Sequence, residues 1–270
     1  MESVKTASSL AALQARRLRL HRLDPSRPLP NARSAAAFVR ERGMVMTTGH
    51  SSLPSLSEGI AGRPISGSWM ATPDVHRIYA ILRGLRAHDL VEAPLILGKA
   101  VLMHPRLGPA LQRVARDPGR CEKAREELSP LARRLLQTVE VRGAIRMDAW
   151  GPAARSRPAR TLLERELLVV ADEVHTEGGY HTVNLRPWRT GQIAARFERE
   201  SRHLAYDEAA EILFLAAVHA AVTAPEREAR RWFAFGGDLV DALLTRKAIR
   251  RLRDRGIPYV VAGRSTSTRC

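Results

Sequence analysis

Apolar residues recur at intervals of three and four along most of the chain, a spacing that predicts helices rather than strands. The clearest stripe lies in residues 129–143, where a capping serine and a first-turn proline start the helix and a glycine ends it. Residues 49–67 and 117–119 carry glycines and prolines that predict loops. Further helices are expected over residues 8–22, 35–42 (capped by Ser34), 73–88 and 145–150, from Pro158, over 207–221, from Thr223, and over 239–252 as one helix or two.

A hairpin is predicted after the helix that Pro158 opens. Residues 167–174 lead up to Gly178-Gly179 and residues 181–185 return, and paired glycines between β-rich runs mark a hairpin. Helix, short helix, helix and hairpin is the order of a winged helix-turn-helix, whose third helix is able to enter a DNA major groove. The residues expected to contact DNA, on or before that helix and on the flanks of the hairpin, are Arg155, Arg157, Arg160, Arg165, His175 and His181.

Other interpretations of this segment stay open. Winged helices also serve as protein–protein modules, and arginines on a helix also occur as a solvated surface. Residues 206–255 resemble a second winged-helix core with a poor wing, in which Thr223 caps a helix and Glu226 completes a capping box. The arginine-rich segment 8–22 is interpreted as a helix docked on the fold, with an amphipathic targeting helix as the alternative.

The charge of the chain favours a polyanionic partner. Lys and Arg total 44 against 28 Asp and Glu among 270 residues, a formal net charge of +16. Residues 1–42 carry nine basic and three acidic residues, and residues 245–270 carry eight basic and one acidic. Such an excess is typical of nucleic-acid-binding proteins. Codon bias in a GC-rich genome also enriches Arg and Ala, which is the compositional alternative.

Several classes of protein are not supported by the sequence. The glycine-rich phosphate loops and the HExxH zinc motif do not occur. Cys121 and Cys270 lack metal-type spacing, and the nine histidines are scattered, so neither a metal nor a cofactor is expected. The longest apolar run, residues 212–224, is too short to span a bilayer. We therefore expect a cytoplasmic protein that binds no small-molecule cofactor and has no membrane partner.

Several segments, taken in order, resemble one family. They are the arginine-rich opening 13–20, the helix end 39–44 (Val-Arg-Glu-Arg-Gly-Met), the loop 54–64, Gly98-Lys99, and the run from Thr223 to Phe233. Together with the central winged helix they resemble the AlkZ-type, crosslink-repair family of winged-helix DNA glycosylases, most closely a shorter "AlkZ-related" branch. The resemblance covers residues 10–252.

The resemblance implies a fold and a partner. It implies a mainly α protein with small β-hairpin wings, built as a tandem winged helix-turn-helix architecture that wraps double-stranded DNA. The expected divisions are 1–120 (N-terminal winged-helix-like region), 121–190 (central winged helix) and 191–270 (C-terminal helical region with a basic tail). Active members of the family excise N-alkylated bases. A monomer is favoured.

The catalytic motif of the family does not carry over. Active members place Gln-x-Gln or Gln-x-Asp just after the glycine that ends the early helix, which is Gly43 here. The corresponding positions are Val45, Met46, Thr47 and Thr48, which offer no carboxylate or amide to orient water. The nearby candidates for a relocated catalytic group are His50 and Glu58, although both residue types are also common at loop surfaces.

Four functions follow from these observations. The leading hypothesis is a DNA-binding protein related to glycosylases acting on alkylated or crosslinked bases, in which the chemistry is lost. The alternatives are an active glycosylase with relocated catalytic residues, a winged-helix transcription regulator, and a module for protein contacts.

Overall fold

The computed structural model describes residues 2–49, 51–151, 153–175 and 181–263. His50, Pro152, the glycine pair at 178–179 and the tail from Arg264 lie outside the described residues. Contacts divide the chain into two compact units, and both are discontinuous in sequence. Unit 1 comprises residues 1–92, 100–107 and 210–270, and unit 2 comprises residues 93–99 and 108–209. No described helix is both long enough and apolar enough to cross a bilayer.

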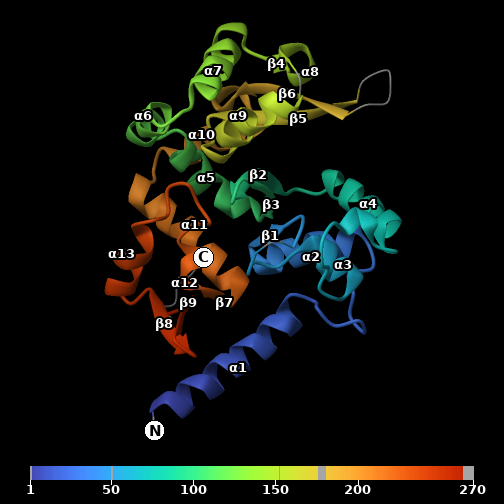
Figure 1. The fold of residues 1–270 in the computed structure, drawn as a ribbon, viewed down its shortest axis with the longest axis vertical. Coiled ribbons are helices and arrows are strands. Elements are labelled where there is room, and N and C mark those ends of the chain that lie inside the picture. The colour runs from blue at the N-terminus through green and yellow to red at the C-terminus, as the bar shows by residue number, and fades with distance from the viewer. Residues whose placement is uncertain (1, 50, 152, 176–180, 264–270) are drawn as a thin grey trace. The chain divides into compact units, whose positions relative to one another are not determined.

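One topology occurs three times along the chain: helix, strand, two further helices, and then two strands (Figure 1). In each case the first strand pairs with the third and the third with the second, which gives the orders β1-β3-β2, β4-β6-β5 and β7-β9-β8. This is the winged helix-turn-helix order. The expected fold class, mainly helical with small antiparallel sheets in tandem winged helices, is therefore confirmed.

The first repeat has Phe38, Val39, Ile60 and Ile78 in its core. Its strand register places Met44 opposite Met103 and Met46 opposite Val101. Its elements are α2 (Ala32–Arg42), β1 (Met44–Met46), α3 (Leu56–Ala61), α4 (Val75–Gly84), β2 (Val91–Ile96) and β3 (Lys99–Met103), with the short 3-10 helices η1 (Trp69–Ala71) and η2 (Leu85–Ala87).

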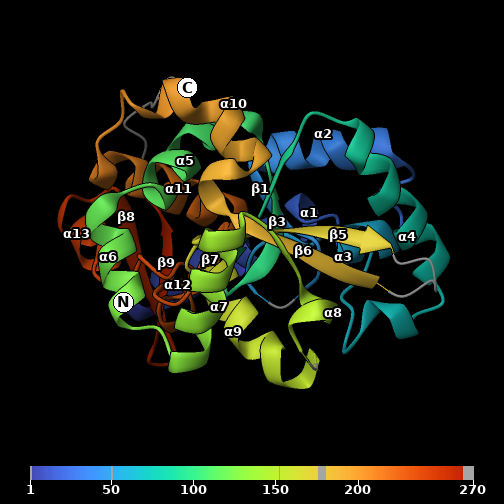
Figure 2. The same cartoon turned by 90° about the horizontal axis from the view of Figure 1, so that it is seen from above.

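The second repeat lies in unit 2 and has the longest hairpin, residues 169–187. Figure 2 shows this hairpin next to the helices α7 and α9 of the same repeat. Leu135, Val139, Leu163 and Leu185 are fully buried in its core. Ser129 caps the first helix by accepting the N–H of Ala132 at 3.3 Å, as the sequence predicts. The elements are α7 (Pro130–Arg142), β4 (Ile145–Arg146), α8 (Met147–Trp150), α9 (Ala153–Arg165), β5 (Val169–His175) and β6 (His181–Pro187).

The third repeat lies in unit 1, apart from the first turn of its leading helix. Phe214, Trp232 and Phe233 form an aromatic cluster in its core, each 2% exposed or less. The elements are α11 (Tyr206–Ala221), β7 (Thr223–Pro225), α12 (Glu226–Ala229), α13 (Leu239–Thr245), β8 (Ile249–Asp254) and β9 (Ile257–Ala262).

The N-terminal helix α1 (Glu2–Leu20) packs against β7 and β8 of the third repeat, so the predicted docked helix is confirmed. Just after it, His21 is 2% exposed, and its Nε2–H donates to the carbonyl of Ala220 at 3.0 Å. Burial, and then the charge of Arg17, lowers the pKa of His21 to about 3, so the ring is neutral. The remaining helices are η3 (Pro105–Leu107), α5 (Gly108–Ala115), α6 (Pro118–Glu126), η4 (Trp188–Thr190) and α10 (Gln192–Ser201).

The predicted helix starts need three corrections. Asn31, not Ser34, caps α2, because its side chain accepts the N–H of Ser34 at 2.9 Å. The helix α9 begins at Ala153, so that Pro158 lies inside it rather than at its start. Asp117 is the cap of α6 and not part of a free turn, since its carboxylate accepts the N–H of Arg120.

The C-terminal elements also differ from the prediction. Thr223 belongs to strand β7 and caps nothing, and its hydroxyl has no hydrogen-bond partner among the described residues. The expected helix over 239–252 is helical only to Thr245, and Ile249 begins β8. The spacing Ile249-x-x-Leu252 would put both side chains on one face of a helix. Pairing with β9 instead selects a strand, in which Ile249 is buried and Leu252 is half-buried.

Candidate functional site

The motif positions that follow Gly43 belong to the core of the first repeat. Val45 and Met46 lie on β1 and are 0% exposed, so their side chains are shielded from solvent. Thr47 is half-buried, and its hydroxyl donates to the carbonyl of Ala100 at 3.3 Å. Thr48 is the first motif position that lines a hollow. The strand itself, Met44–Met46, contains no carboxylate or amide side chain.

Glu58 lies beside the end of the motif. It is the third residue of α3, which Ser55 caps, and one of its oxygens accepts the N–H of Ile65 at 3.1 Å. The carboxyl group packs against the backbone of Gly49, where a Cβ atom would lie 2.5 Å from the Glu58 Cδ. Glycine at position 49 therefore allows this carboxylate to approach the loop.

A hollow of about 10 Å³ lies on the same loop and is bordered by two hydroxyl side chains. It has room for about one water molecule. Loop 48–49 lines the hollow and also contacts Glu58, which places a carboxylate near the hydroxyl groups. The lining residues are Thr48, Gly49, Ser57, Ile65, Gly67 and Trp69.

Two elements from elsewhere in unit 1 hold this loop. Glu228 of α12 accepts hydrogen bonds from the backbone N–H and the hydroxyl of Ser52, and from the indole N–H of Trp232 at 3.1 Å. Arg17 of α1 donates from Nε to the carbonyl of Ser52 at 3.2 Å. Burial lowers the pKa of Arg17, while the carboxylates of Glu228 and Glu58 act in the opposite direction.

Sequence reasoning selected Glu58 but missed Glu228 and Ser52. The two residues are 176 positions apart, and neither belongs to a motif that would connect them. The local sequence around Glu228, Glu226-Arg227-Glu228, shows two acidic residues close together but gives no indication of the contact with Ser52. His50, the other expected candidate, lies outside the described residues.

The arginines expected on α9 occupy different environments. Arg157 is exposed and has no ion-pair partner among the described residues. Arg160 is half-buried, with its Nε 3.2 Å from Glu164. Burial raises the pKa of Glu164, and the charge of Arg160 opposes that rise. Arg160 is therefore the counter-ion of a half-buried carboxylate and is not a free surface cation.

The C-terminal half of α9 is partly covered. Gly98, in the turn between β2 and β3, lies against it, since a Cβ at Gly98 would be 3.5 Å from the Cβ of Arg165 and 3.7 Å from Thr161. Arg165 remains 48% exposed, and its Nε is 4.0 Å from Glu166. Arg157 and Pro158 in the other half of the helix are also exposed.

The remaining expected contacts flank the tip of the hairpin. His175 and His181 pair across β5 and β6 as the last residues in register before the tip. The backbone of Arg155 lies in the first turn of α9. The side chains of these three residues lie outside the described part of the structure, so their contact with DNA stays a prediction.

Comparison with known proteins gives one structural likeness. No family model matches the chain, and no curated protein matches it. Among solved structures, the chain is similar to the DNA glycosylase AlkZ of Streptomyces sahachiroi, with 14% identity and a TM-score of 0.45. The alignment covers 91% of this chain and 67% of that one. At this identity and score the likeness carries no conclusion about activity, and the fold assignment rests on the threefold winged-helix topology itself.

Proposed function

We propose that this chain is a duplex DNA-binding protein in which the central winged helix contacts the DNA and the glycosylase chemistry of the AlkZ-type family is absent. The carrying observation is Arg157. It is an exposed cation without a partner among the described residues, on the N-terminal half of the third helix of a winged helix. That half is the part of such a helix that enters the major groove. The net charge of +16 supports a polyanionic partner.

The burial of β1 supports the loss of chemistry. Excision of a base needs a group that orients water and stabilises a developing positive centre on the sugar. Val45 and Met46 supply neither, and both are fully buried. The motif segment therefore contributes packing to the first repeat instead of reactive groups.

Arg157→Ala is expected to weaken binding to an undamaged duplex about fivefold and to lower the salt slope of log K by about one, because one phosphate contact is lost. Fluorescence anisotropy with a labelled duplex across a salt series measures both quantities. Arg134→Ala is the matched control, since Arg134 is an exposed arginine on another helix of the same repeat. Equal weakening by both variants, or an unchanged slope for Arg157→Ala, would contradict the proposal.

Arg160→Ala tests whether Arg160 contributes to folding stability and not to DNA binding. This change leaves the half-buried Glu164 without its counter-ion, so we expect a loss of folding stability of about 1–2 kcal/mol. The salt slope of DNA binding should stay that of the unmodified protein. A slope lowered as much as in Arg157→Ala would show that Arg160 also contacts phosphate.

One observation favours a second function, an active glycosylase that uses Glu58. The Glu58 carboxylate packs on the loop whose hollow matches a single water molecule, and two hydroxyl groups line that hollow. A carboxylate and a positioned water are the parts that base excision requires.

The test of this second function is base release from a duplex that carries one N7-methylguanine, with protein in excess. Abasic sites are scored as strand breaks after heating in base. Breaks above a no-protein control that disappear in Glu58→Gln and persist in Glu41→Gln, an exposed acid on α2, would establish the enzyme. No breaks, together with binding to the same duplex, would leave the non-catalytic protein. No binding at physiological salt would leave a module for protein contacts.

A further inference from the structure

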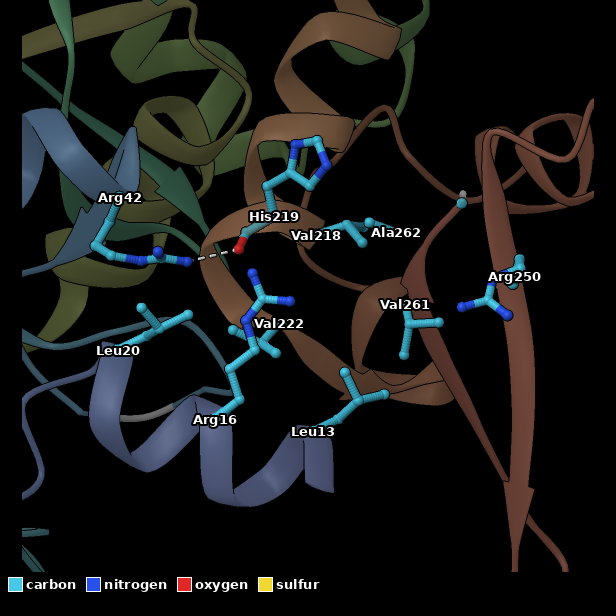
Figure 3. Close-up of a pocket in the computed structure, with 11 residues that line it drawn as sticks. Leu13, Arg16, Leu20, Arg42, Val218, His219, Val222, Arg250, Val261 and Ala262 are labelled. Atoms are coloured by element: carbon cyan, nitrogen blue, oxygen red, sulfur yellow. Dashed lines mark hydrogen bonds between the residues drawn. The ribbon is translucent and has the colours of Figure 1, made fainter. Parts of the chain in front are cut away.

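A pocket of about 230 Å³ in unit 1 stands apart from every residue discussed above for DNA binding or base excision. It lies between the N-terminal helix, the end of α2, the end of α11 and the last hairpin (Figure 3). Its volume is below that of sites for drug-sized molecules. The lining residues are Leu13, Arg16, Leu20, Arg42, Val218, His219, Val222, Arg250, Val261, Ala262 and Gly263.

The charged groups of this pocket are all of one sign. Arg16, Arg42 and Arg250 line it, and no carboxylate of the described residues does. Among the described residues, neither Arg16 nor Arg250 has an ion-pair or hydrogen-bond partner. Figure 3 shows Arg16 reaching from α1 and Arg42 reaching from α2 to the same stretch of α11, with Arg250 on β8 across the pocket. Cations that surround one hollow without a counter-ion favour an anion in it.

The hydrogen bonds of Arg42 are incomplete, which also favours an anionic ligand in the pocket. Its terminal nitrogen donates to the carbonyls of His219 at 2.7 Å and Ala220 at 3.3 Å. Its Nε is buried and has no acceptor among the described residues. Burial lowers the pKa of Arg42, the charge of Glu41 acts in the opposite direction, and the charge of Arg16 lowers the pKa again. An anion beside these two guanidinium groups would relieve their repulsion.

The other walls of the pocket are apolar. Five of the lining side chains present only branched hydrocarbon, and the others are three arginines, Ala262 and His219, with Gly263 lining through its backbone. The five are Leu13, Leu20, Val218, Val222 and Val261. Burial, together with the charges of Arg42, Arg106 and Arg16, lowers the pKa of His219, so the ring is neutral at pH 7. A bare inorganic ion would leave these walls uncovered, whereas a ligand with a short apolar body would cover them.

We infer that this pocket binds a small organic anion, with a phosphate or carboxylate head held by Arg16 and Arg42 and a short apolar body against Leu13 and Val261. A guanidinium group can donate two parallel hydrogen bonds to either a phosphate or a carboxylate. A small metabolite would therefore bind to unit 1, and this inference does not depend on DNA binding.

Hexyl phosphate is the first probe, and hexanoate carries the same body with the other head group. Inorganic phosphate supplies the head alone and hexanol the body alone. We expect hexyl phosphate or hexanoate to bind with at least tenfold higher affinity than inorganic phosphate or hexanol, measured by calorimetry on the full chain. The stronger of the two organic anions identifies the head group. The NMR signal of the His219 ring should shift on binding.

Arg16→Gln should weaken binding of the preferred organic anion at least fivefold. Arg19→Gln is the matched control, because Arg19 is exposed on the same helix and lines no part of the pocket. The inference is overturned if neither organic anion binds below 10 mM, if both variants weaken binding equally, or if inorganic phosphate binds as tightly as hexyl phosphate. Arg250→Gln provides a second readout should Arg16→Gln disturb the docking of α1.

Discussion

Replacement of Trp232 by alanine is expected to lower the free energy of unfolding by about 4 kcal/mol, since it removes a fully buried indole and leaves a cavity. The ring is 1% exposed and lies with its centroid 5.9 Å from that of Phe214. Its N–H also donates to Glu228, the residue that holds Ser52 in the loop beside Glu58. The change should therefore loosen that loop as well as the core of the third repeat.

Urea unfolding followed by circular dichroism measures the loss. Trp232→Phe keeps an aromatic ring and removes the hydrogen bond, and about 1–2 kcal/mol is expected for it. Trp69→Ala is the control for the loss of an indole, because Trp69 is only half-buried and should cost less than half as much as Trp232→Ala. Equal costs for Trp69→Ala and Trp232→Ala would contradict the assignment of Trp232 to the core.

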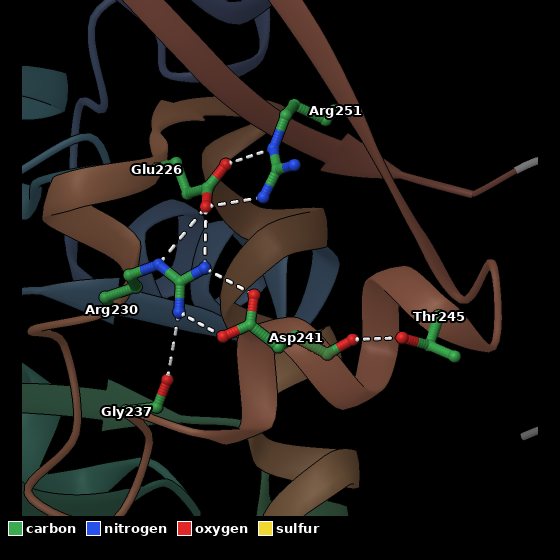
Figure 4. Close-up of polar contacts among 6 residues, drawn as sticks. All are labelled: Glu226, Arg230, Gly237, Asp241, Thr245 and Arg251. Carbon is green, nitrogen blue, oxygen red and sulfur yellow. Dashed lines mark hydrogen bonds and ion pairs between the residues drawn. The ribbon is translucent and has the colours of Figure 1, made fainter.

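Replacement of Glu226 by glutamine is expected to lower the free energy of unfolding by about 2 kcal/mol at pH 7, because it removes a buried charge from two arginines. One carboxylate oxygen accepts from Arg230 at 2.7 Å and from Arg251 at 2.8 Å, and the side chain is 8% exposed (Figure 4). Arg230 also bridges to Asp241 at 2.6 Å. The network therefore ties α12, α13 and β8 together.

The effect should depend on pH in one direction. The hydrogen bond from Arg251, followed by that from Arg230, lowers the pKa of Glu226 below its ordinary value of 4.5. The carboxylate therefore contributes stability that is complete above that value and is lost as the pH falls through the lower pKa of the folded state. The difference between the unmodified protein and Glu226→Gln should shrink below about pH 4.5.

Asp241→Asn is the matched control for this network. Asp241 also pairs with Arg230, but its side chain is 64% exposed, so solvent screens the pair and its loss should cost much less than the loss of Glu226. A constant difference between the unmodified protein and Glu226→Gln from pH 7 to pH 3 would show that the carboxylate of Glu226 is not the source of the stability.

The sequence predicted the type and the approximate bounds of an element correctly where several local signals coincide. The helix α7 has a capping serine, a first-turn proline, an apolar stripe and a terminal glycine, and it runs from Pro130 to Arg142 as predicted. The hairpin of β5 and β6 was equally well marked. Shorter elements carry fewer signals. The six-residue helix α3 was interpreted as loop, since its flanking glycines and prolines dominate the local pattern.

The threefold repetition of the winged-helix topology was harder to predict from the sequence than the individual helices and strands. Sequence analysis identified one complete copy and one partial copy from the residues, and the tandem arrangement followed from the family resemblance. The three copies keep the same element order and the same sheet order while sharing no visible sequence repeat. Burial of an apolar face by each helix and strand is enough to maintain such a topology, and it accepts many different apolar residues.

The sequence by itself determined the helical class, the central winged helix and the basic charge, because these depend on neighbouring residues or on composition. Only the tertiary structure decided which charges are free. Arg157 is exposed and Arg160 is held by Glu164, although both lie on one helix. Likewise, Arg16, Arg42 and Arg250 surround one pocket from three distant segments. Ion pairing and pocket formation depend on contacts between residues far apart in the chain, which no local pattern records.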